Sequence, residues 1–206
     1  MIIKYNGILG SFEYNDADFK IREETEIIYL QYIGKETNGL KIKIPDGIKN
    51  CRYMFENCVY LKISPIIPEG VKDCSFMFCG CENLKIAPKI PKSAKNCQGI
   101  FWHCYSLETP PVIPEGVTNC YEMFYYCKNL KTAPKIPEGV KNCEYMFCGC
   151  KNLKAPPIIP KGVEVCSYMF FDCINLEILP YVPEAVEHKE NMFIGCKKAI
   201  INSLFL

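Results

Sequence analysis

The sequence repeats itself every 23 residues over most of its length. One copy reads Asn142-Cys-Glu-Tyr-Met-Phe-Cys-Gly-Cys-Lys-Asn-Leu-Lys-Ala155, and a Met-Phe or Ile-Phe pair recurs in each copy without insertion or deletion. The pairs begin at Met54, Met77, Ile100, Met123, Met146, Met169 and Met192. Copies in such strict register predict a solenoid, in which each copy forms one coil and stacks on its neighbours.

The charge balance and the distribution of apolar residues narrow the range of functions. Lys and Arg number 24 and Asp and Glu 23, so the net charge of +1 creates no strong field for nucleic acid or an anionic membrane. No run approaches the ~18 apolar residues of a membrane span, and the first residues lack the apolar core of a secretory signal. We therefore expect a cytoplasmic protein whose partner is neither a membrane nor a nucleic acid. A leader removed from the chain would instead place it at the cell surface.

Most of the 15 cysteines fall on two columns of the repeat. A residue that recurs once per coil stacks on its equivalents, and a buried free cysteine behaves as a small hydrophobic residue. We expect reduced thiols that pack in the core. Disulfides between coils stay open as an alternative, because like cysteines of neighbouring coils would lie within about 5 Å. The columns are Cys51, Cys74, Cys97, Cys120, Cys143 and Cys166, and then Cys58, Cys81, Cys104, Cys127, Cys150, Cys173 and Cys196.

Each copy places four apolar residues at the spacing of one helix face. In the copy quoted above they are Cys143, Met146, Phe147 and Cys150, at positions i, i+3, i+4 and i+7. This spacing predicts a two-turn helix whose apolar side lies on the stack. The residue before the first cysteine is Asn or Asp in the early copies, and such residues accept the free amides of a first helical turn.

The part of the copy that follows the helix pattern predicts a short parallel strand. Its side chains alternate, and the inward residues of one copy are expected to be Leu130, Thr132, Pro134 and Ile136. Two prolines per copy remove backbone donors, so pairing is expected over only three or four residues. Stacked strands lie about 4.8 Å apart and stacked helices lie further apart, so the strand side should be concave and the helix side convex.

The two ends of the chain do not carry the repeat and predict caps. The β-branched runs Ile2–Tyr5, Ile27–Ile33 and Leu40–Ile44, the last of which reaches the first residue of the repeat, indicate strands of an N-terminal β cap, which is predicted to span residues 1–43. The solenoid is predicted to span residues 44–198. The apolar residues 199–206 should either cover the last coil or join a weak homo-oligomer; otherwise we expect a monomer.

The repeat, which covers about Ile44 to Ala199, resembles the leucine-rich repeats of the BspA-like class. Its pattern is Ile-Pro-x-Gly-Val-x-x-Cys-x-x-Met-Phe-x-x-Cys-x-x-Leu, whereas that class has Ala-Phe in place of Met-Phe and lacks the second proline of the strand. The Met-Phe-x-x-Cys-x-x-Leu part is similar to repeats of bacterial and phage proteins. The resemblance implies a leucine-rich-repeat horseshoe of about seven coils that serves as a binding scaffold, often at a cell surface or in host interaction. It implies no catalytic residues.

The sequence contains no convincing catalytic or metal-binding set, so we expect neither an enzyme nor a cofactor. A pair formed by His103 and Cys104 would need two side chains that diverge on a helix. The Cys-Gly-Cys motifs at Cys79 and Cys148 lie three coils apart, roughly 14 Å at about 4.8 Å per coil, whereas Zn–S bonds are about 2.3 Å. They cannot share one zinc ion.

Two surfaces are candidates for binding a protein partner. Aromatic residues are predicted on the outer face of the helices, and an aromatic stripe of this kind is typical of protein interfaces. The alternative is that these rings pack on the neighbouring coils. Lysines of the concave side suggest an acidic partner, and the alternative there is a solvated charged surface. The candidate residues are Trp102, His103, Tyr125, Tyr126 and Phe171 on the outer face, and Lys85, Lys89, Lys131 and Lys135 on the concave face.

These features together predict a non-enzymatic scaffold that binds a macromolecule through a repeat surface. One alternative is a phage or bacterial antagonist that binds and blocks a host protein. The other is a structural protein that assembles with itself through the apolar tail. The repeat does not encode the identity of the partner.

Overall fold

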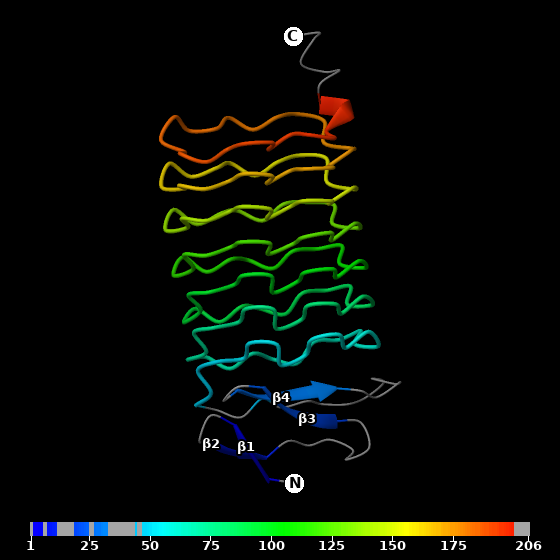
Figure 1. Ribbon diagram of the computed structural model, residues 1–206, viewed down its shortest axis with the longest axis vertical. Coiled ribbons are helices and arrows are strands. Elements are labelled where there is room, and N and C mark those ends of the chain that lie inside the picture. Colours follow the sequence, from blue (N-terminus) through cyan, green and yellow to red (C-terminus); the bar gives the residue numbers. More distant parts are fainter. Residues whose placement is uncertain are drawn as a thin grey trace.

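Successive copies of the repeat lie over one another as coils of a single stack (Figure 1). The structure is a computed structural model that describes the backbone of residues 2–5, 8–11, 19–24 and 27–32, and residues 44 and 47–199 in full. Parallel bridges join each coil to the next at the residue before the first cysteine column. The bridged residues are Asn50, Asp73, Asn96, Asn119, Asn142, Val165 and His188. The predicted repeat solenoid is confirmed.

Two antiparallel hairpins precede the stack and lie beyond its N-terminal end in Figure 1. Strand β1 (Ile2–Tyr5) pairs with β2 (Ile8–Ser11), and β3 (Phe19–Glu24) pairs with β4 (Ile27–Tyr32). The runs predicted as strands at the start of the chain and at 27–33 therefore form β1 and β4, whereas β2 and β3 were not predicted. The run 40–44 lies outside the described residues, except for its last residue. The role of these hairpins as a cap stays a prediction.

The core of the stack consists of columns of identical side chains. The phenylalanines of the Met-Phe pairs are fully buried from Phe55 to Phe170, and the methionines and leucines beside them are buried as well. Neighbouring rings of the phenylalanine column are stacked, with centroids 5.5 to 6.0 Å apart. Each buried side chain of this size contributes about 1.5–3 kcal/mol, so the columns supply the main stabilisation of every coil.

The predicted helices between the two cysteine columns are wrong. The eight residues of this segment, such as 143–150, form consecutive turns, which we call the outer turn of each coil. Its third and seventh residues have positive φ, for example Tyr53 at 55° and Asn57 at 56°, whereas every residue of a right-handed helix has negative φ. Helical residues in the described part of the chain are confined to 197–199. No helix there is long and apolar enough to cross a membrane.

The outer turn is held by hydrogen bonds that alternate between two kinds of partner. The amides of Tyr145 and Phe147 donate to the carbonyls of Ser167 and Met169 in the next coil, at 3.0 and 2.9 Å. The amide of Met146 instead donates within the turn, to the carbonyl of Cys143 at 3.1 Å. An apolar face at i, i+3, i+4 and i+7 is thus produced by turns with i to i−3 bonds. Tertiary bonds between coils replace the i to i−4 bonds of a helix.

The column of Asn and Asp before the outer turn acts locally, as predicted, but starts a turn instead of a helix. The side-chain oxygen of Asn142 accepts the amide of Glu144, two residues on, at 2.8 Å. The same contact recurs at Asn50, Asp73, Asn96 and Asn119. These side chains satisfy an amide that neither the turn nor the next coil can reach.

The predicted strands of residues such as 130–137 are present only as isolated contacts between coils. A bridge joins Ile86 to Thr109, Ile66 is a further bridge residue, and the prolines of each copy lack the donors that would extend such pairing. The inward–outward alternation holds for Leu130, Pro134 and Ile136, which are buried, but fails for the exposed Thr132.

The coils form an upright stack with little curvature in Figure 1. The horseshoe was predicted because helices would have spread the coils on one side. The outer turns are instead joined by backbone hydrogen bonds of 2.6–3.1 Å, so this cause of curvature is missing.

All the cysteines are free and buried, and the second column forms a ladder of hydrogen bonds. The thiol of Cys127 donates to the carbonyl of Phe101 in the preceding coil at 3.1 Å. Equivalent contacts of 3.1–3.2 Å are made by Cys81, Cys104, Cys150, Cys173 and Cys196. The predicted packing role of these thiols is confirmed, and each also bonds two coils together.

Candidate functional site

The segment that follows the leucine of each copy carries most of the exposed large apolar side chains of the described residues. We call its exposed side the proline face, because each segment holds at least two prolines. These prolines are buried or half-buried and fix the path of the chain. Of the two residues between them, the first is exposed and the second lies in or against the core. The segments are residues 62–69, 85–92, 108–115, 131–138, 154–161 and 177–184.

One column of the proline face alternates between apolar and basic residues. Ile66, Val112 and Ile158 are 86%, 85% and 89% exposed, so no residue that the structure describes covers them. Lys89 and Lys135 occupy the coils between them and are also exposed. The column ends at Tyr181, which is 76% exposed. Such a row of uncovered aliphatic side chains is costly in water and indicates a binding surface.

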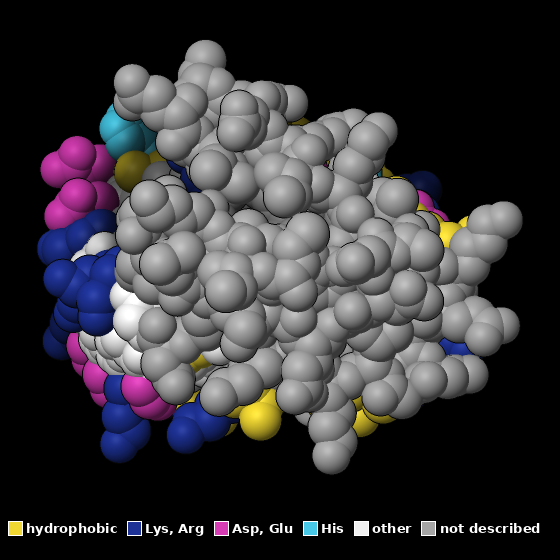
Figure 2. All heavy atoms as spheres, turned by 90° about the horizontal axis from the view of Figure 1, so that it is seen from below, with side chains coloured by type: hydrophobic (Ala, Val, Ile, Leu, Met, Phe, Trp, Pro, Cys, Tyr) yellow, Lys and Arg dark blue, Asp and Glu magenta, His cyan; other side chains and the backbone are white. Residues whose placement is uncertain are grey.

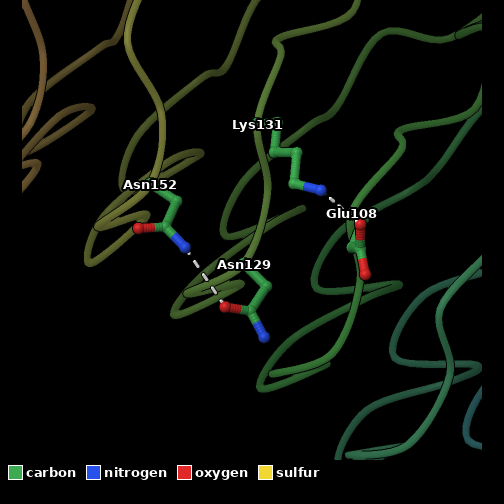
Figure 3. Close-up of polar contacts among 4 residues, drawn as sticks. All are labelled: Glu108, Asn129, Lys131 and Asn152. Carbon is green, nitrogen blue, oxygen red and sulfur yellow. Dashed lines mark hydrogen bonds and ion pairs between the residues drawn. The ribbon is translucent and has the colours of Figure 1, made fainter.

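The lysines of this face are partly neutralised by the chain itself. Lys131 bonds Glu108 of the preceding coil at 2.5 Å, as Figure 3 shows. This contact lowers the pKa of the Glu108 carboxyl, and Lys85 lowers it further. Lys135 lies 3.6 Å from Glu115. The predicted convergence of four lysines is therefore diluted by carboxylates, and the face is less basic than the sequence indicated.

The same close-up shows how side chains link consecutive coils beside this face. Asn152 donates its amide to the side-chain oxygen of Asn129 at 3.2 Å (Figure 3). From the N-terminal end, Figure 2 shows lysine and carboxylate side chains of the stack gathered along one side. Exposed pairs of this kind contribute roughly 0–1 kcal/mol each, so they leave the lysines available to a partner.

Two equivalent hollows lie on the proline face, two coils apart. The first has a volume of about 260 Å³ and the second about 200 Å³. Each hollow is formed by an apolar side chain of one coil and a lysine of the next, between walls of proline. The first is lined by Pro65, Ile66, Pro68, Pro88, Lys89 and Pro91, and the second by Pro111, Val112, Pro134, Lys135 and Pro137.

The predicted aromatic stripe on the outer turns exists, but its rings are half-buried against one another. Trp102 stacks on Tyr125 of the next coil, with ring centroids 5.6 Å apart and planes at 4°. His103 packs on Trp102, and Tyr126 packs edge-on against His103 with centroids 5.5 Å apart. Phe171 lies further along the stack, beside Tyr168. Four of the five candidates thus lie together, and the packing alternative accounts for much of their burial.

A carboxyl group lies inside this aromatic region. Glu122 is half-buried, and loss of water raises its pKa above the ordinary value, although a hydrogen bond from Tyr121 opposes the shift. Partial burial also raises the pKa of Tyr125 to about 12, with Cys148 beside it as a smaller cause. The pKa of His103 is lowered by burial and, to a smaller degree, by Lys128, both of which favour the neutral imidazole. None of these groups is paired as a general acid and base would be.

The thiols have the wrong electrostatics for nucleophilic chemistry. Burial raises the pKa of Cys74, Cys79 and Cys148 to about 12, so the reactive thiolate is scarce near neutral pH. Among the residues that the structure describes, no group of three His, Cys, Asp or Glu side chains could hold a metal ion.

The hollows of the proline face were missed by sequence reasoning. Lys89 and Lys135 were among the predicted binding residues, and the two-coil period with which they alternate with Ile66 and Val112 was the signal that could have located the hollows. The aromatic candidates were easier to recognise because large rings are conspicuous in any sequence.

Comparison with known proteins supports the fold and the repeat class. Solved structures with similar folds include a leucine-rich repeat protein of T. pallidum, with a TM-score of 0.70 and 24% sequence identity over 91% of this chain and 90% of that one. Another is a leucine-rich repeat protein of Bacteroides ovatus, with a TM-score of 0.61 and 26% identity over 81% of this chain. The match spans 45% of that longer protein. No curated protein has a significantly similar sequence.

A family profile provides the assignment. The BspA-type leucine-rich repeat region matches in six copies, over residues 14–131, 49–177 and 98–200. Together these matches include nearly all of the stack. The chain therefore belongs to the BspA-type leucine-rich repeat family.

Proposed function

We propose that this protein binds another protein through the proline face. Leucine-rich repeats of this kind serve in general as scaffolds for protein interaction and typically have no catalytic role. The observation that carries the proposal is the row of Ile66, Val112 and Ile158, each at least 85% exposed on a rigid stack. Burying each of these side chains against a partner would contribute about 1.5–3 kcal/mol.

The aromatic stripe is the second candidate surface, centred on Trp102, Tyr125 and Tyr126. It carries large rings on adjacent coils, but their stacking already removes part of their surface from water. The proline face offers more uncovered apolar area together with lysines that an acidic partner could pair with. Lys85 and Lys89 would contribute to that pairing more than Lys131 and Lys135, which have carboxylate partners of their own.

The test is capture of the partner from an extract of the native host, followed by measurement with the purified partner. The variant I66S/V112S/I158S should bind on the order of tenfold more weakly per lost side chain, at unchanged melting temperature. The matched control is I174S/I194S, which removes two exposed isoleucines outside the face. Equal binding by the triple variant and the wild type would contradict the proposal.

A double variant, W102A/Y125A, separates the two surfaces. If the aromatic stripe binds the partner, this variant loses binding and keeps its melting temperature. If the rings serve mainly to hold the coils together, it loses stability and keeps binding at low temperature. We expect the second result, because the rings stack on each other at 5.6 Å.

The partner could be of two particular kinds. One is a host protein that this chain binds and blocks, and the other is a second copy of the chain. Sizing of the purified chain with and without residues 204–206 tests self-assembly, because the apolar tail is the segment predicted to drive it. A monomer in both forms would remove the structural, self-assembling alternative. The tail lies outside the described residues.

A further inference from the structure

The hollows of the proline face have a fixed repeat distance, and a ligand that fills both must share it. Equivalent lining residues of the two hollows, such as Pro65 and Pro111 or Lys89 and Lys135, are 46 residues apart, which is two coils. The coils are joined by backbone hydrogen bonds, and chains bonded in this way lie about 4.8 Å apart. The two hollows are therefore about 9.6 Å apart along the stack.

This distance matches one regular peptide conformation better than the others. A polyproline II helix has three residues per turn and a rise of about 3.1 Å, so equivalent side chains recur on one face every 9.3 Å or so. Side chains on one face of a β-strand recur every ~6.7 Å, and those of an α-helix at i and i+7 every ~10.5 Å. Of these three periods, only that of polyproline II agrees to within a few tenths of an ångström with the distance of about 9.6 Å between the two hollows.

The lining of the hollows indicates what the ligand carries. Each hollow offers an exposed aliphatic side chain and several proline rings, which suit an apolar residue. Each also offers a lysine, Lys89 or Lys135. Glu69, which lines the first hollow, accepts the backbone amide of Lys92 at 3.1 Å, and Glu115 in the second lies 3.6 Å from Lys135 between two well exposed side chains. An incoming carboxylate can replace such a weak pair.

On the basis of the proposed function, we infer that the partner docks an extended polyproline II segment along the proline face. An apolar residue at every third position fills the hollows, and an acidic residue beside it pairs with Lys89 or Lys135. The segment runs along the axis of the stack and binds both hollows at once. The second contact is then intramolecular, which raises affinity well above that of one hollow.

Fluorescence anisotropy with labelled peptides tests the inference. The probe is a peptide of four repeats of Leu-Pro-Glu, and the first control is a peptide of the same composition with the three-residue period scrambled. The second control is an alternating Leu-Glu peptide of equal length, which has the period of a strand. We expect the probe to bind at least tenfold more tightly than either control.

Charge is tested separately with matched variants. Replacing Glu by Gln and then by Lys in the probe should weaken binding stepwise. In the protein, the variant K89Q/K135Q should remove most of the dependence of binding on the charge of the peptide. The control variant K72Q/K95Q changes two exposed lysines of another column and should keep that dependence. Equal binding of probe and scrambled peptide, or no binding of the probe, would overturn the inference. If the I66S/V112S/I158S variant still loses the natural partner in that case, the proposed function stands without the polyproline II segment.

Discussion

At the scale of single residues, the protein uses cysteine as a structural donor. The second-column thiols are buried, and from Cys81 onward each donates to a phenylalanine carbonyl of the preceding coil. That carbonyl also accepts an amide of its own turn, as Phe101 does from Cys104 at 3.1 Å. A small apolar residue with a weak donor fits this position better than serine, which would lose more by leaving water.

Alkaline pH should therefore unfold the protein well before it reaches the pKa of the buried thiols. Burial raises the pKa of Cys74 and Cys148 to about 12 from an ordinary value of 9.0. The folded state thus holds protons that the unfolded state loses, so the stabilisation is complete below pH 9 and is lost between pH 9 and 12. Each fully buried thiol contributes a slope of about 1.4 kcal/mol per pH unit.

Thermal melts under reducing conditions between pH 7 and 11 check this expectation. The melting temperature should stay level up to about pH 8.5 and then fall steeply. A level melting temperature up to pH 11 would show that the thiols do not lose protons on unfolding and would contradict their burial.

At the scale of elements, the outer turn replaces the expected helix. Its positive-φ positions are filled by Tyr53, Tyr145 and Tyr168 as well as by glycine, so the chain accepts some backbone strain there. The bonds to the next coil compensate for it. At Gly99 the side chain is missing for a further reason, because an added Cβ would lie 2.2 Å from the ring of Phe76.

Substitution of Gly99 should separate the cost of the contact with the Phe76 ring from the general cost of losing a glycine. G99A should destabilise the protein by about 2 kcal/mol or more, because φ is +54° and the Phe76 ring must move. G139A is the matched control, since its φ is ordinary and its nearest neighbour is a carbonyl oxygen at 3.4 Å. The measurement is urea denaturation of both variants, and similar losses would contradict the described turn.

The difference between the predicted helix and the observed turn has a physical cause. The spacing of Cys143, Met146 and Phe147 requires only that three side chains share a face, and a helix and a run of i to i−3 turns both provide this. The choice between them depends on bonds to the next coil, which no single copy reveals. The columns of buried side chains were predictable, because they depend only on the 23-residue register of the repeat.

For the candidate site too, the sequence predicted which residues share a face but not the contacts that they make. The proline face and its lysines could be named from the period of the repeat, but their ion pairs with Glu108 and Glu115 depend on side-chain reach across coils. The half-burial of Trp102 and Tyr125 agrees with the alternative that these rings pack on neighbouring coils, which the sequence raised but could not decide, since the geometry of stacking between coils is not encoded in one copy.

At the scale of the whole molecule, the stack is a linear array in which each coil contacts its two neighbours. Stability is then a sum of coil and interface contributions, and coils of the same register are interchangeable. Removing residues 120–142 joins Asn119 to Cys143 and restores every column. This deletion should give a folded protein with a melting temperature lower by several degrees.

Deletion of residues 120–131 is the control, because it shifts the columns by half a copy. It should not fold. The melting transition and the near-ultraviolet circular dichroism of the two deletions are the measurements. If the 23-residue deletion also fails to fold, the coils are not equivalent units.

Direct backbone hydrogen bonds between coils hold the outer turns in place. Residue-resolved hydrogen exchange by NMR tests this arrangement most directly, with Phe101, Phe124 and Phe147 as reporters, since their amides bond the next coil at 2.9–3.1 Å. Within the described part of the chain, the amides of Val112 and Ile158 have no such bond, and these residues serve as the internal control. The predicted result is exchange on the order of a thousandfold slower at the three phenylalanines than at the control residues. Equally fast exchange at both sets would contradict the account.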